Sequence, residues 1–159
     1  MVLGGIALKL NKLVNSKMME KILYFILIGG GVIFITLPFC LKWYLEFSNI
    51  YTTSNYIKIL VILYSSGILA LGIVNFTIKL LKNVNKNKPF SKDNVKLLRN
   101  ISIFCLIIAV IYLIAIPIIK SVFTIILFMI FTIMGFMCNV LSGLFDKAIE
   151  YKEENELTI

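Results

Sequence analysis

Apolar residues in this chain form long blocks that short polar segments separate. Residues 22–41, 59–78 and 101–119 contain no charged side chain, and a fourth such block, 122–145, follows after only Lys120 and Ser121. Each block meets the requirement of about 20 residues for a helix that crosses a hydrocarbon core of about 30 Å. The pattern therefore predicts an all-α, polytopic membrane protein in which residues 1–159 form a single four-helix domain.

The third and fourth blocks must be separate helices. A single helix over residues 101–145 would be about 68 Å long, which is more than twice the thickness of the hydrocarbon core. We expect a tight hairpin between Pro117 and Ser121, since proline weakens the helical hydrogen bonds there and the long side chain of Lys120 reaches the membrane interface.

The polar segments predict the orientation of these helices. Of the 16 lysines and arginines, thirteen lie before residue 22, in the basic loop 79–100 or in the tail 146–159, and Lys42, Lys58 and Lys120 lie on the other side. Cytoplasmic loops carry an excess of lysine and arginine. We therefore expect both termini and the basic loop in the cytoplasm, and a multi-pass protein of the bacterial cytoplasmic membrane.

Composition supports a lipid environment. Hydrophobic residues make up 60% of the chain, charged residues 15%, and mean hydropathy is +0.96, whereas soluble domains are about 25% charged. The net charge of +8 would suggest nucleic acid as a partner of a soluble protein. Here the cations flank the apolar blocks, so topology and contact with the lipid bilayer explain them, and no direct contact with nucleic acid is expected.

Candidate chemistry is sparse. The chain has no histidine, and Cys40, Cys105 and Cys138 show no paired spacing. The four apolar blocks also lack the carboxylate that a proton-coupled transporter uses inside the membrane. We predict no enzyme activity, no catalytic or metal site and no cofactor.

The most polar side chains inside the predicted spans are Asn75 and Asn139. Both lie near the cytoplasmic ends of their spans, so we predict a hydrogen-bonded contact between helices in the bundle interior rather than a role in permeation. A strip of small residues, Gly135, Ser142 and Gly143, accompanies Asn139. Close packing within the bundle explains this strip, and dimerisation is the alternative.

The segments that flank the spans carry their own patterns. Leu3, Ile6, Leu10 and Leu13 recur at helical spacing, which is typical of a helix that lies in the membrane interface. In the basic loop, Ser91 is placed to cap a helix whose first turn holds Asp93. The tail is acidic and could contact the basic loop, but a solvated helix end is the simpler interpretation because an exposed ion pair contributes about 0 to 1 kcal/mol.

Two of these segments carry a family resemblance. Residues 87–94 read Asn-Lys-Pro-Phe-Ser-Lys-Asp-Asn and residues 153–159 read Glu-Glu-Asn-Glu-Leu-Thr-Ile. They resemble the YoaS-like bacterial membrane proteins of unknown function, although Glu156 stands where aspartate is common in that family. The resemblance implies a four-span protein without assigned chemistry, often encoded beside a small Cro-like helix-turn-helix regulator.

We therefore expect a non-enzymatic membrane regulator or scaffold that binds a cytoplasmic partner such as a helix-turn-helix transcription regulator. The predicted partner-binding residues are Phe90, Ser91, Asp93, Asn94, Glu153, Glu154, Asn155, Leu157 and Ile159. The alternative is a small permeation or immunity protein that acts as a homo-oligomer through the fourth span. A permeation role would require a polar pore lining, and the spans supply few polar side chains.

Overall fold

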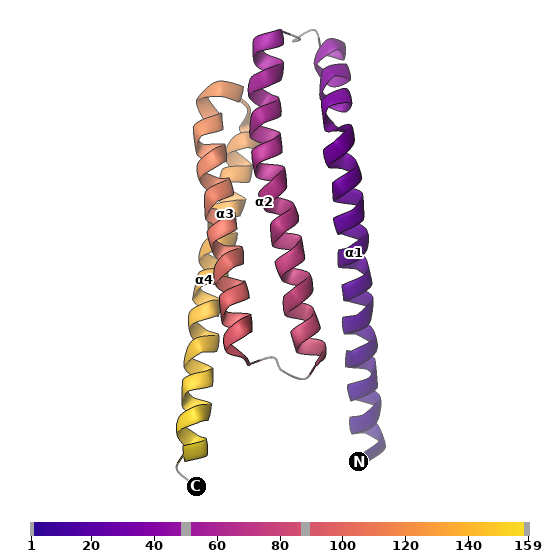
Figure 1. Cartoon of the computed structure of the whole chain (residues 1–159), viewed down its shortest axis with the longest axis vertical. Coiled ribbons are helices and arrows are strands. Elements are labelled where there is room, and N and C mark those ends of the chain that lie inside the picture. The colour runs from indigo at the N-terminus through magenta and orange to yellow at the C-terminus, as the bar shows by residue number, and fades with distance from the viewer. Residues whose placement is uncertain (1, 49–51, 87–89, 158–159) are drawn as a thin grey trace.

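The chain forms four long helices in a computed structural model (Figure 1). The structure describes the backbone of residues 2–48, 52–86 and 90–157, and the side chains of residues 17–48, 52–86 and 90–155. The helices are α1 (Val2–Phe47), α2 (Thr53–Asn85), α3 (Lys92–Ile119) and α4 (Val122–Leu157). All four are long and apolar enough to cross a membrane, and the described residues form no strand. The predicted all-α fold with four spanning helices is confirmed.

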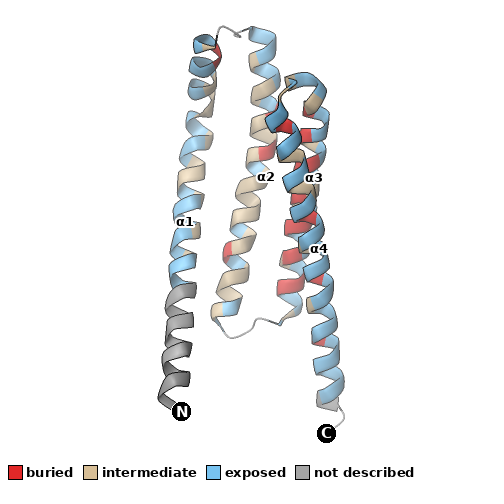
Figure 2. Ribbon diagram, turned by 180° about the vertical axis from the view of Figure 1, so that it is seen from behind, coloured by how far each residue is buried: buried red, intermediate tan, exposed pale blue. Residues whose placement is uncertain are grey.

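The helices follow one another in space as they do along the chain. Within the described residues, α1 packs against α2, α2 against α3, and α3 against α4. The two outer helices, α1 and α4, each have one neighbouring helix, so the arrangement is open rather than a closed four-helix bundle (Figures 1 and 2). Both termini and the connection between α2 and α3 lie at the same end, which we call the lysine-rich end (Figure 1).

The predicted hairpin between the last two helices is confirmed. Helix α3 ends at Ile119, and Lys120 adopts a left-handed backbone conformation (φ 51°, ψ 39°) while its N–H donates to the carbonyl of Ile116 at 3.0 Å. Helix α4 then begins at Val122. A left-handed residue directly after a helix reverses the chain within a few residues, so α4 returns alongside α3.

Helix α3 holds most of the buried residues because it packs between α2 and α4 (Figure 2). Its residues Ile108, Tyr112 and Ala115 join Ile62 of α2 in the hydrophobic core. The ring of Tyr112 stacks on Phe131 of α4 with 6.1 Å between ring centroids, and its hydroxyl lies 3.4 Å from the hydroxyl of Ser66 of α2. Tyr112 thus contacts both neighbouring helices.

Small residues bring α3 and α4 close together. The hydroxyl of Ser102 donates to the carbonyl of Gly135 at 2.8 Å, and the hydroxyl of Ser142 donates to the carbonyl of Val95 at 3.2 Å. A β-carbon added at Gly135 would lie 2.8 Å from Leu106. Gly135 and Ser142, which belong to the small-residue strip, therefore serve packing within one chain.

The interfacial helix predicted before the first span does not form as a separate element. Helix α1 is continuous from Val2 to Phe47, and Pro38 lies inside it. The sequence between the two predicted segments, from Val14 to Lys21, contains neither glycine nor proline. Because nothing there interrupts the helical hydrogen bonds, the N-terminal segment extends the first span instead of turning away from it.

Candidate functional site

The start of α3 has the predicted capping structure. Ser91 precedes the helix with an extended backbone (φ −139°, ψ 148°), and its hydroxyl accepts the N–H of Asn94 at 3.3 Å. Asp93 lies in the first helical turn, where its negative charge complements the helix dipole. The predicted helix start at this position is confirmed.

Asn94 joins two helices. Its side chain is 1% exposed, and its Oδ1 atom accepts a hydrogen bond of 2.8 Å from Nδ2 of Asn83 in α2. A buried polar side chain is retained where it is hydrogen-bonded. Asn94 therefore fixes the end of α2 against the start of α3, and its side chain is not part of the exposed surface that a partner would contact.

Phe90 and Lys92 lie against α4 at the lysine-rich end. The ring of Phe90 is 5.3 Å from the ring of Phe145, yet Phe90 is still 56% exposed. The Nζ atom of Lys92 lies 3.1 Å from a carboxylate oxygen of Glu153. The basic loop and the acidic tail thus contact each other, although a solvated helix end was the simpler expectation. Both side chains of this ion pair are more than half exposed, so it contributes about 0 to 1 kcal/mol.

The acidic tail continues α4 as a helix. Helix α4 runs 12 residues beyond Phe145 to Leu157, which is about 18 Å at the helical rise, and this end projects past the connection between α2 and α3 (Figure 1). Glu153, Glu154 and Asn155 are exposed on it. The side chain of Leu157 and the whole of Ile159 lie outside the described residues.

Asn75 and Asn139 do not form the predicted contact within one chain. Both are exposed, Asn75 on α2 and Asn139 on α4, and these two helices are not neighbours. The prediction that they face the bundle interior is therefore wrong for a single chain. The physical reason is the open arrangement, which leaves one face of α2 and most of α4 uncovered (Figure 2).

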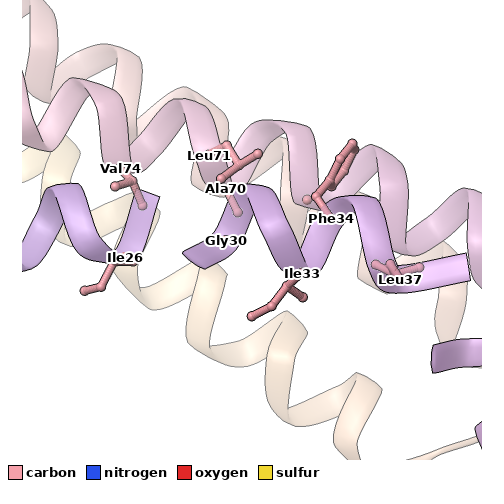
Figure 3. A pocket seen from close by; sticks show the side chains of 9 residues that line it. Ile26, Gly30, Ile33, Phe34, Leu37, Ala70, Leu71 and Val74 are labelled. Atoms are coloured by element: carbon pink, nitrogen blue, oxygen red, sulfur yellow. The ribbon is translucent and has the colours of Figure 1, made fainter. Parts of the chain in front are cut away.

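An apolar cleft of about 250 Å³ lies between α1 and α2 (Figure 3). The cleft is lined by Ile26, Gly30, Ile33, Phe34, Leu37, Gly67, Ala70, Leu71 and Val74. At the lysine-rich end the two helices are joined by a hydrogen bond of 3.2 Å from Asn85 to Glu20, and by Lys82, whose Nζ atom lies 5.2 Å from the ring centroid of Tyr24. All nine residues that line the cleft are apolar.

Residues 43–159 match the family described as "Protein of unknown function (DUF2975)". The chain belongs to this family. The match begins near the end of α1 and includes α2, α3 and α4, so it contains Phe90, Lys92 and the acidic tail. The family is uncharacterised, and the narrower YoaS-like resemblance stays a prediction. Neither the curated proteins nor the solved structures gave a match.

Proposed function

We propose that this DUF2975 protein is a non-enzymatic regulator or scaffold whose lysine-rich end lies in the bacterial cytoplasm and binds a soluble protein there. The excess of lysine and arginine at this end supports the orientation. A small helix-turn-helix transcription regulator is the partner that the YoaS-like resemblance suggests.

The exposed ring of Phe90 is the observation that carries this proposal. Phe90 is 56% exposed at the lysine-rich end, where the Lys92–Glu153 ion pair and the exposed residues Glu154 and Asn155 are also found. Exposed aromatic side chains with a polar surround are typical of the contact residues of protein interfaces. The segment that holds Phe90 is not needed to span the membrane.

The contact between Lys92 and Glu153 suggests how such a partner would gain access. Both side chains of this ion pair are exposed to solvent. A partner with a complementary charge would therefore break the pair at a cost of at most about 1 kcal/mol. Binding would then use Phe90 as an apolar anchor, while the projecting end of α4 supplies carboxylates that attract a basic surface.

The experiment is a cross-linking pull-down from native membranes, followed by binding measurements between the captured protein and the purified full chain. We expect the deletion of residues 153–159 and the Phe90→Ala variant each to reduce capture, because recognition depends on this end and insertion depends on the spans. Tyr151→Ala is the matched control, since Tyr151 is a 65% exposed aromatic residue of α4 at the same end. Normal capture by the deletion and by Phe90→Ala would contradict the proposal.

A further inference from the structure

Two polar stripes with the same spacing run along exposed faces of α2 and α4. The stripe on α2 consists of Asn75, Lys79, Lys82 and Lys86, and the stripe on α4 consists of Asn139, Gly143, Asp146 and Glu150. Each set is separated by four, three and four residues, which places its members on one face of a helix. All of these residues are exposed except Lys82, which is half-buried.

The stripes run in the same direction. Helices α2 and α4 both end at the lysine-rich end (Figure 1). Each stripe therefore begins with an asparagine in the apolar part of its helix and continues toward charged residues at that end. The charges have opposite signs at equal distances from the asparagine: Lys82 matches Asp146, and Lys86 matches Glu150.

A single chain does not bring the two stripes together. Asn75 is nine residues from Ser66, which corresponds to about 180° around a helix, and Ser66 is buried against Tyr112 of α3. The α2 stripe thus faces away from the core, and within one chain its member Lys82 also lies 5.2 Å from the ring centroid of Tyr24 of α1. On α4, Ser142 contacts α3 while Asn139 and Gly143 are exposed, and a β-carbon added at Gly143 would meet nothing within 4 Å.

Contact with lipid explains why many apolar residues of these helices are exposed, but it does not explain the exposure of the two asparagines. Apolar side chains that face lipid need no partner, because lipid tails are as apolar as leucine. An amide exposed to hydrocarbon is costly unless it is hydrogen-bonded. An asparagine both donates and accepts hydrogen bonds, so the side chain of Asn139 is a complete partner for that of Asn75.

We propose that α2 of one copy packs in parallel against α4 of a second copy of this chain. In this contact Asn75 bonds Asn139 inside the membrane, while Lys82 faces Asp146 and Lys86 faces Glu150 at the lysine-rich end. Gly143, opposite Lys79, allows the helices to approach closely. Because the two surfaces differ, the contact is heterologous and repeats from copy to copy until a ring closes. It leaves Phe90 free and does not depend on the proposed function.

The first test measures energy transfer between donor-labelled and acceptor-labelled full chains in liposomes as the protein-to-lipid ratio rises. We expect Asn75→Leu and Asn139→Leu each to weaken association roughly threefold to twentyfold, the range of interhelical polar contacts in membranes. The double variant should be no weaker than either single variant, because both remove the same bond. Independent, additive effects would overturn the pairing, and so would no association at any protein density.

A charge swap tests the register of the contact. Lys86→Glu and Glu150→Lys should each weaken association, and the chain that carries both should recover it, because every contact then regains one opposite pair. Lys96→Glu on α3 is the matched control, since it changes charge equally at an exposed position outside both stripes. A double variant weaker than both single variants would refute the pairing of Lys86 with Glu150.

Cross-linking tests the same contact without reference to its strength. In both copies the native Cys40, Cys105 and Cys138 are first changed to alanine. One copy then carries Lys86→Cys and the other carries Glu150→Cys. The two copies are mixed in membranes, and a short bis-maleimide is added. We expect a covalent dimer, and much less of it when Lys96→Cys replaces Lys86→Cys. Equal yields from the two mixtures would show random collision and overturn the proposal.

Discussion

Gly135→Ala is expected to destabilise the contact between α3 and α4. An added β-carbon would lie 2.8 Å from both Cγ and Cδ2 of Leu106 and 3.4 Å from its backbone nitrogen. Because Cγ is the branch point of leucine, rotation of a terminal methyl group does not relieve this clash. Relief requires a less favourable χ1 rotamer of Leu106 or a separation of the two helices, and separation also lengthens the 2.8 Å hydrogen bond from Ser102 to the carbonyl of Gly135.

The magnitude follows from two opposing effects. Overpacking of a close contact costs about 1 to 3 kcal/mol, whereas alanine is favoured over glycine in a helix by up to about 1 kcal/mol. Gly31→Ala in α1 is the matched control, because an added β-carbon there meets nothing within 4 Å and Gly31 lies outside the proposed contact between copies. The difference in unfolding free energy between the two variants isolates the steric cost, which we expect to be about 1 to 3 kcal/mol.

The assay is unfolding of the purified protein by a rising fraction of sodium dodecyl sulfate in mild detergent micelles, followed by circular dichroism and by resistance to proteolysis. Leu106→Ala in the Gly135→Ala background should recover part of the loss, because it removes the clashing atoms. Equal stability of the Gly135→Ala and Gly31→Ala chains would refute the close approach of α3 and α4 at this position.

Three further predictions concern the lysine-rich end. Reporter fusions after Ile159 and within residues 82–88 should be cytoplasmic, and a fusion near Ser54 should be external. An external C-terminus would refute the orientation inferred from the lysine and arginine distribution. Asn94→Ala should lower the unfolding free energy by about 1 to 2 kcal/mol in the same detergent titration, because it removes the bond to Asn83 from a buried site. Lys92→Ala should change that free energy by less than about 1 kcal/mol, and a larger loss would mean that the exposed ion pair with Glu153 is structural.

The sequence by itself determined the number of helices and several of their ends. Four apolar blocks of adequate length leave a chain in lipid no alternative to spanning helices, because backbone groups must be hydrogen-bonded within each segment. The hairpin around Lys120 followed from length alone, and the cap at Ser91 followed from local side-chain chemistry. The helix ends depend on nearby residues, which the sequence shows directly. The spans depend on the surrounding lipid, which the long apolar blocks of the sequence indicate.

Only the tertiary structure decided which helices are neighbours and which polar residues meet. Inside a membrane no hydrophobic force distinguishes one apolar helix face from another, so the pattern around a helix does not reveal its packing side. The sequence therefore located Asn75 and Asn139 in the spans but placed them wrongly in the interior of a single chain. The contacts of Phe90 with Phe145 and of Lys92 with Glu153 join segments that are distant in the sequence, and they exist because α4 returns beside α3 and continues as a helix past the start of α3.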